Sequence, residues 1–373
     1  MTTGRRQLTI CHMASDQHED RAGEYVRLQI RWRLVAIIAE LLFLAALTLV
    51  VRRVGAIGSE IPLWQVAGPA VMAYAILMLP IVYHLGFRLP HRFCLTGRRA
   101  AYEFGVVVLA RGMLGVAVPF SIFHPRLNGY AWWWAYTVGA WAIFLLWKMK
   151  IMFCGRRPFR HKPQELQSTS KTDAMQQFAR EHGFENLMLL SVHPVGCERA
   201  MYAASGSYKM QPAVYLSDNM IEDFSLPELQ FVIAHELAHL ARRNRLRAAV
   251  ARLAVVFCIL ACTLALLNRL APDARSVLQA AHAAPVLLLV AWLADFILSP
   301  VLLADSRRCE RRANAAALEM TNNPAAMISA MNKLARSNLA SGRPGWLQKL
   351  LFTTHPSLCE VVSQAQQYAA QRP

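Results

Sequence analysis

Acidic residues are scarce in this chain of 373 residues: 23 aspartates and glutamates stand against 40 lysines and arginines. The eight cysteines form no CxxC pair and no dense framework, which argues against a disulfide scaffold and fits reduced thiols. No internal repeat is present, and the one biased segment is a basic linker. The first 33 residues hold no apolar run. This is unlike a cleavable signal peptide, so the first apolar run is expected to remain as an anchor.

Apolar residues, by contrast, make up 55% of the chain and gather in runs, several of which approach or exceed the length of about 18 residues typical of a bilayer span. The runs are residues 34–51, 66–87, 105–123, 131–147, 248–267 and 285–303. We therefore expect a mainly α-helical, polytopic membrane protein with about six spans. Glu40, Arg111, Arg252 and Asp295 fall inside these runs, where ionisable groups are costly and usually face a cavity or a partner. Arg252 and Asp295 lie at similar depths, so they either pair or line a chamber.

The basic residues alternate between numerous and sparse from one loop to the next. Six precede the first predicted span and six follow the fourth, whereas two follow the first span and one follows the third. The positive-inside rule then places both termini on the cytoplasmic side. The net charge of +17 is assigned to topology and to contact with anionic lipid headgroups in the bilayer, and no nucleic acid is expected as a partner. The bacterial cytoplasmic (inner) membrane is the expected location, although the endoplasmic reticulum follows the same topology logic.

An HExxH pentad carries the chemistry of the sequence. It contains His235, Glu236 and His239, and Ser225 with Glu228 predicts a capping box at the start of its helix. Two histidines four residues apart on a helix lie on one face, so both imidazoles can reach one metal ion. Glu236 can direct its carboxylate at a water rather than at the metal. A chance match is expected about once in a hundred chains of this length, and a surface helix with stray histidines is the alternative.

Glu310 is the best candidate for a third ligand on geometric grounds. A catalytic zinc site usually takes three protein ligands and leaves one position open. His239 lies nine residues before the predicted fifth span, and Glu310 lies seven residues after the sixth. Both would stand about 10 to 14 Å above the same membrane face if the helices run on unbroken. The hairpin of the two spans therefore returns Glu310 to the height of His239.

The sequence resembles the integral-membrane zinc metallopeptidases that include the HtpX heat-shock protease and the type I CAAX prenyl endopeptidases. The resemblance covers roughly residues 173–360 and rests on AVYLSDNMIEDFSLPELQFVIAHELAHL, SRRCERRANAAALEMT, NPAAMISAMNKL and THPSLCE. It implies a cytoplasmic zincin-like α+β metallopeptidase domain mounted on membrane helices. The ExxAD pattern of the family falls on Glu310 to Asn314, so the resemblance implies one Zn²⁺ per chain held by His235, His239 and Glu310. It also implies that His355 assists the oxyanion, while Glu236 acts as the general base.

Two positions depart from the family pattern. Asn314 stands where the family has an aspartate that orients a ligand histidine, and an amide there carries no charge. Arg199-Ala200 stands where an Asn-Ala pair usually starts the substrate strand. The expected function is a membrane-embedded zinc-dependent endopeptidase, acting on a peptide or protein. The alternatives are a catalytically weak or inactive protease-like receptor or scaffold and, less favoured because no repeated halves are visible, a transporter-like protein. Misfolded membrane proteins, a dedicated precursor and a prenylated peptide all remain open as substrates, and the oligomeric state is open too.

The predicted organisation follows from these assignments. It comprises a loosely ordered cytoplasmic N-terminal segment (1–33), a four-helix membrane region (34–147), a basic linker (148–172), a zincin-like domain with the HExxH helix (173–247), a transmembrane hairpin (248–303), and a third-ligand helix with a C-terminal helical part (304–373). Inside the zincin-like domain we expect a helix over 172–183, strands over 187–192 and 213–216, and a weaker strand over 200–204. An exposed strand edge there could hold an extended peptide. Residues 345–352 form an amphipathic piece that lies either on the membrane surface or against the soluble domain.

Overall fold

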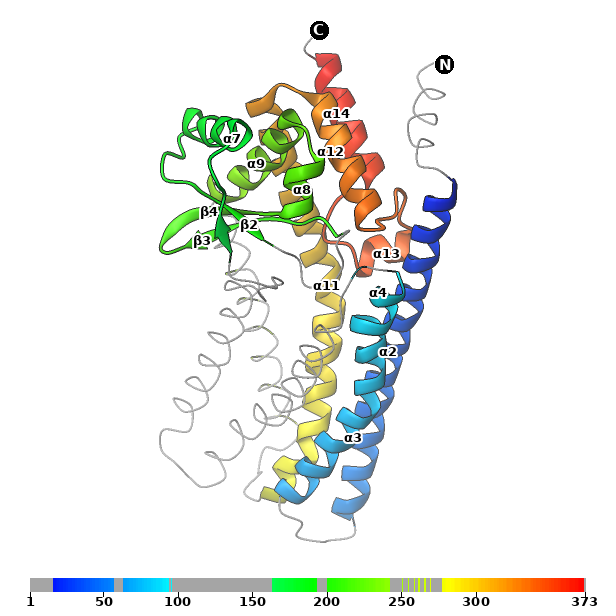
Figure 1. Ribbon diagram of the computed structural model, residues 1–373. Helices are drawn as coiled ribbons and strands as arrows, with labels where there is room; N and C mark the ends of the chain where they lie inside the picture. The colour runs from blue at the N-terminus through cyan, green and yellow to red at the C-terminus, as the bar shows by residue number, and fades with distance from the viewer. Residues whose placement is uncertain are drawn as a thin grey trace.

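The computed structural model describes residues 16–56, 63–93, 95, 163–192, 200–241 and 277–371, together with isolated helical positions between 250 and 269. The third and fourth predicted spans, most of the fifth, and Arg111, Arg199 and Arg252 lie outside the described residues. What is described is mainly helical, as expected, with one small sheet. Long helices form one end of the molecule in Figure 1, and the sheet and shorter helices form the other.

Three helices pack side by side at the apolar end of the molecule: α2 (Asp16–Ala56), α3 (Leu63–Tyr83) and α11 (Val277–Thr321) (Figure 1). In the described part, two helical stretches are long and apolar enough to cross a bilayer, Asp20–Val51 and Met72–Arg92. They correspond to the first and second predicted spans. The second passes from α3 through a π-helical turn, η1 (His84–Arg88), into α4 (Leu89–Arg92). The outward faces of the three helices expose large apolar side chains, among them Ile38, Leu42, Leu49, Ile76, Ile297 and Val301.

Glu40 joins the three long helices to one another. Tyr74 of α3 donates to Glu40 Oε1 at 2.9 Å, and Trp292 of α11 donates to Oε2 at 2.8 Å. Both carboxylate oxygens therefore have a partner, which a polar group inside an apolar bundle requires. Through these two hydrogen bonds, Glu40 links α2 to α3 and to α11 at this level of the bundle.

The N-terminal segment was expected to be loosely ordered, and this expectation is wrong from Asp16 onward. Helix α2 runs unbroken from Asp16, so the predicted boundary at residue 33 falls inside a helix. The reason is tertiary packing, because Ala22 lies in a buried cluster with Leu89, Phe93 and Leu339. Since Leu339 belongs to the C-terminal part of the chain, this cluster ties the polar end of α2 to that part.

Helix α11 links the apolar bundle to the opposite end of the molecule. It holds the predicted sixth span and the predicted third-ligand helix in one continuous element of 45 residues. At 1.5 Å per residue it is about 67 Å long, more than twice the thickness of a bilayer core. Glu310 therefore lies on the same continuous helix that is predicted to cross the membrane.

The sheet has four strands in the order β1-β2-β4-β3: β1 (Gln164–Glu165), β2 (Met188–Val192), β3 (Ala203–Tyr208) and β4 (Gln211–Ser217). Strands β2 and β4 pair in parallel, and β3 returns antiparallel to β4 as a hairpin. The weak strand expected at 200–204 begins three residues later, because its register is set by this hairpin. The two-residue strand β1 was not predicted. Strand β3 forms an edge of the sheet.

Helices cover the sheet and close a common core. Helix α7 (Ser170–Glu181), predicted at 172–183, has a capping box formed by Thr169 and Thr172 and is followed by Gly183 at φ +85°. The other helices of this region are α8 (Asp218–Asp223), α9 (Leu226–Ala241), α12 (Pro324–Ser337) and α14 (Leu358–Gln371), with α13 (Trp346–Leu351) beside α11. The buried core contains Met175, Leu216, Phe231, Ile233, Leu237, Ala317, Met327 and Val361. It locks α9 against α11, which positions the site.

Candidate metal centre

Helix α9 carries the HExxH pentad, as the sequence predicts. Half of the predicted capping box is present, since the backbone N–H of Ser225 donates to Glu228 at 2.7 Å. Buried Phe231, Ile233 and Leu237 hold the helix in the core. Because these three side chains fix the rotation of α9, the two histidines face the neighbouring helix α11.

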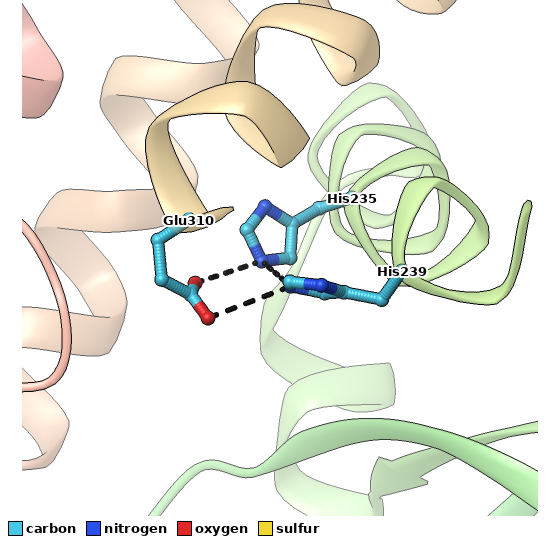
Figure 2. A group of neighbouring side chains, drawn as sticks. All are labelled: His235, His239 and Glu310. Atoms are coloured by element: carbon cyan, nitrogen blue, oxygen red, sulfur yellow. Dashed lines mark hydrogen bonds and ion pairs between the residues drawn. The ribbon is translucent and has the colours of Figure 1, made fainter. Parts of the chain in front are cut away.

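Glu310 of α11 meets both histidines (Figure 2). His235 Nε2 lies 3.3 Å from Glu310 Oε2, His239 Nε2 lies 3.5 Å from Glu310 Oε1, and the two Nε2 atoms lie 3.1 Å apart. The three side chains are 13%, 20% and 14% exposed. The structure therefore brings together residues that are 71 positions apart in the sequence.

The donor set and its spacing fit zinc. Two imidazole nitrogens and one carboxylate are a common ligand set of catalytic zinc sites, which leave a fourth position open. A tetrahedral ion with bonds of about 2.1 Å separates its ligand atoms by about 3.4 Å. The two Nε2 atoms are 3.1 Å apart and His235 Nε2 lies 3.3 Å from Glu310 Oε2, both close to this value, whereas the 3.5 Å distance from His239 Nε2 ends on the other carboxylate oxygen, Oε1. With one ligand atom taken from each residue, all three atoms lie within 4.8 Å of one another. Among the described residues, this is the group of histidine, cysteine and carboxylate side chains that could hold a metal ion.

The electrostatics of the group are dominated by Glu310. Burial raises the pKa of Glu310, but hydrogen bonds from His235, His239 and His355 outweigh this effect and hold the pKa well below its ordinary value. Burial lowers the pKa of His235, yet the bond to Glu310 and the charge of Glu236 raise it overall. A carboxylate that stays ionised beside paired imidazoles is a preformed cation site, in which protons and a metal ion compete for the same nitrogens.

Glu236 and His355 both lie close to the group. Glu236 is 8% exposed and close enough for its charge to raise the pKa values of His235 and His355. His355, expected near the site only from the family resemblance, comes from the loop before α14, and its Nδ1 lies 3.0 Å from Glu310 Oε2. Its side chain is 71% exposed, so it borders the open side of the group.

Tyr202 is a neighbour of the site that sequence reasoning missed. Burial raises the pKa of the Tyr202 phenol, and the charge of Glu236 adds to the increase. Its position two residues after Ala200, where the family's substrate strand usually starts, was the available signal. The residue is 39% exposed.

Asn314 lies one helical turn beyond Glu310 and is 1% exposed. Its Oδ1 and the Nδ1 of His235 are both buried atoms without a hydrogen-bond partner among the described residues. Asn314 nevertheless contributes to raising the pKa of His235, so the amide and the imidazole face each other. An Nδ1–H that donates to Oδ1 would satisfy both atoms and would leave Nε2 as the metal ligand.

The replacement Asn314→Asp is expected to tighten zinc binding about tenfold to a hundredfold. A carboxylate in this place would accept the proton of His235 Nδ1 with a full charge, which makes the ligand nitrogen more basic. The measurement is competition with a chelator of known affinity at pH 7. Asn323→Asp, on the helix cap of α12, is the control for added charge, and an Asn314→Asp affinity equal to or below that of the unmodified chain contradicts the role assigned to this amide.

Glu228 lies near the N-terminus of α9 and binds side chains of α12. Burial raises the pKa of Glu228, but bonds from Lys333 at 2.7 Å, Ser329 and Ser225 outweigh it and lower the pKa to about 2. Since Lys333 and Ser329 belong to α12, the carboxylate joins α9 to the C-terminal part of the fold.

Glu228→Gln is expected to lower the free energy of unfolding by about 1–3 kcal/mol at pH 7. The pKa of Glu228 is depressed from 4.5 to about 2, so its stabilising contribution is present above pH 4.5 and is lost as the pH falls toward 2. The unfolding midpoints of the two proteins should therefore converge on acidification. Glu222→Gln, at an exposed carboxylate of α8, is the control; a gap between Glu228→Gln and the unmodified chain that stays constant down to pH 3 would contradict the assignment.

The fold and the grouping together define a class of protein: helical metallopeptidases that hold an HExxH helix between a small sheet and a third-ligand helix. Residues 165–369 match the peptidase family M48. That region is more than half of the chain, and the chain belongs to this family, which confirms the resemblance identified in the sequence.

Individual relatives are more distant. The chain is 27% identical over 194 residues to a protein named "Protease HtpX homolog" from Streptococcus pneumoniae (strain Taiwan19F-14), a match that covers 44% of this chain and 62% of that protein. The homologue from strain Hungary19A-6 gives 27% identity over 189 residues with the same coverage. The chain thus matches less than two thirds of the length of these relatives. The crystal structure of S. mikatae Ste24p superposes with a TM-score of 0.65 at 16% identity, covering 94% of this chain and 89% of that chain, which shows a shared fold.

Proposed function

We propose that the protein is a zinc-dependent endopeptidase embedded in a membrane. The observation that carries the proposal is the convergence of His235, His239 and Glu310, whose ligand atoms lie within 4.8 Å of one another. Family membership and the long apolar helices support the same function. The likeness to protease HtpX homologues points to protein substrates.

Each residue of the group and around it has its own role in the proposed reaction. A zinc ion held by His235, His239 and Glu310 would supply a Lewis acid that polarises the scissile carbonyl and acidifies a water. Glu236 accepts the proton of the attacking water and returns it to the leaving amine. His355, on the open side, donates a hydrogen bond to the oxygen on which negative charge develops.

Strand β3 is the proposed substrate-binding edge. It lies at the end of the sheet, in contact with α9. An extended peptide can add to such an edge through backbone hydrogen bonds. Asn338 supports the start of the strand, because its side chain accepts from the N–H and donates to the carbonyl of Met201, at 3.2 and 3.0 Å. The substrate backbone would then pass in front of the metal group.

We place the site and both termini on the cytoplasmic face of a bacterial inner membrane, on the strength of the arginine and lysine distribution in the sequence. Helix α11 supports a site close to that face, since it leaves the predicted span at residue 303 and reaches Glu310 about 10 Å further on.

The test combines metal analysis with proteolysis on the full-length protein in detergent. We expect one zinc ion per chain, and cleavage of an unfolded protein such as casein that a chelator abolishes and zinc restores. Protein that binds zinc but cleaves no peptide would favour the receptor or scaffold alternative. Protein that neither binds zinc nor cleaves contradicts the proposal outright.

A further inference from the structure

A cavity lined by basic side chains opens beside α11. It has a volume of about 880 Å³ and lies among α11, α13, α14 and the loop before α13. Its cationic lining residues are Arg307, Arg308, Arg311, Arg343 and Lys349, and Glu360 is the one acid among the described residues that line it. Because each residue turns a helix by about 100°, Arg308 and Arg311 lie on a different face of α11 from Glu310. His235, His239 and Glu310 are absent from the lining, so the cavity is separate from that group.

The cations of this cavity have different roles. Arg307 is buried and donates to the carbonyl oxygens of Lys349 and Thr353, at 2.7 and 2.8 Å, which fastens α13 to α11. Lys349 pairs with Glu360 at 2.6 Å. Arg308 and Arg311 are exposed, and neither forms an ion pair with any part of the chain that the structure describes. Two adjacent guanidinium groups are thus left without a compensating charge in a concave site.

The height of Arg308 matches that of lipid headgroups, and Arg311, eight residues beyond residue 303, lies about 12 Å along the helix axis, just above that layer. Arg308 lies five residues beyond residue 303, the end of the predicted span, which is about 7 Å along the helix axis. The headgroup layer extends about 5 to 8 Å beyond the hydrocarbon core on each side. A basic pocket at the cytoplasmic end of membrane helices is a typical binding site for anionic headgroups.

Helix α13 supplies a second, independent indication. Trp346 is 78% exposed and Leu350 is 41% exposed, although both are large apolar residues. The helix lies at the level where α2 becomes apolar, because Arg33 stacks over the Phe352 ring at 5.1 Å. Tryptophan is enriched at the boundary between membrane and water. Of the two positions expected for this amphipathic piece, the exposed side chains favour the membrane surface.

We infer that the cavity binds the phosphate of an anionic membrane phospholipid, with Arg308 and Arg311 as its principal ligands. Guanidinium groups bind phosphate oxygens through paired, charge-assisted hydrogen bonds. A free phosphate ion offers the same chemistry, but the exposed Trp346 and Leu350 beside the cavity favour a ligand with acyl chains. The inference rests on the membrane placement proposed above.

The test uses the full-length protein in detergent, titrated with dioctanoyl phosphatidylglycerol or with dioctanoyl phosphatidylcholine, and native mass spectrometry counts the bound lipid. The anionic lipid is expected to bind at least about tenfold more tightly than the zwitterionic one. Arg308→Gln/Arg311→Gln should weaken its binding about tenfold to thirtyfold, since each basic residue contributes about 1 kcal/mol. Arg180→Gln/Arg312→Gln changes the net charge equally at exposed positions outside the cavity, and should bind like the unmodified chain.

Equal binding of the two lipids, or equal losses in the two double variants, would overturn the inference. If inorganic phosphate displaces the lipid at an equal concentration, the ligand of the cavity is a soluble phosphate. This result would also overturn the inference. Zinc content and casein cleavage are measured on the same preparations. A failure confined to lipid binding therefore counts against the headgroup site, whereas loss of zinc or cleavage in the unmodified chain counts against the proposed function.

Discussion

Glu236→Gln is expected to retain zinc and to lower the rate of peptide cleavage by about a hundredfold to ten-thousandfold. The carboxylate is 8% exposed and belongs to the pentad, yet it is absent from the group of side chains whose ligand atoms converge. The amide of glutamine has the same shape but cannot accept the proton of the attacking water at neutral pH. The loss should therefore appear in kcat, while zinc stoichiometry and the unfolding midpoint stay unchanged.

Glu319→Gln, at an exposed carboxylate further along α11, is the matched control and should cleave at the unmodified rate. If Glu236→Gln cleaves casein normally, Glu236 is not the general base. A Glu236→Gln protein that loses both zinc and activity would instead show that this carboxylate helps to hold the metal or the fold of α9.

The grouping of His235, His239 and Glu310 could be anticipated because it depends on short-range rules. His235 and His239 follow from helical periodicity, and Glu310 follows from the equal distances of the two helices from the predicted membrane hairpin. Both rules need only that helices continue without a break, and α11 does so over 45 residues. His355 could be reached only through the family resemblance, since it lies on a loop whose path no periodicity describes.

Other features depend on contacts between distant parts of the chain. The helical state of residues 16–33 depends on the packing of Ala22 against Leu89 and Leu339, and a polar composition alone does not reveal such a partner. The parallel pairing of β2 with β4 brings together strands that are separated by β3 in the sequence. Arg307 also escaped prediction, because its role is to donate to two carbonyl groups about 40 residues away. In each case tertiary packing decides what local sequence leaves open.

Glu310→Gln is expected to abolish stable zinc binding, with a loss of affinity of about a hundredfold to a thousandfold. Zinc sites with four ligands bind with about 10–16 kcal/mol, which is about 2.5–4 kcal/mol for each ligand. The amide is neutral and a poorer ligand than a carboxylate, and the variant also removes the charge that raises the pKa values of His235 and His355. The measurement is zinc content after dialysis against a weak chelator, with cleavage recorded in parallel.

Glu310→Gln and Glu236→Gln form a matched pair, because each removes one charge from a mostly buried carboxylate beside the same histidines. If Glu310 is a ligand and Glu236 the base, the first variant loses zinc and the second keeps it, although both lose activity. If Glu310 merely forms ion pairs with protonated imidazoles, its replacement leaves zinc stoichiometry at the unmodified value. Retention of one zinc per chain in Glu310→Gln would therefore remove α11 from the metal site and, with it, the geometric basis of the proposed mechanism.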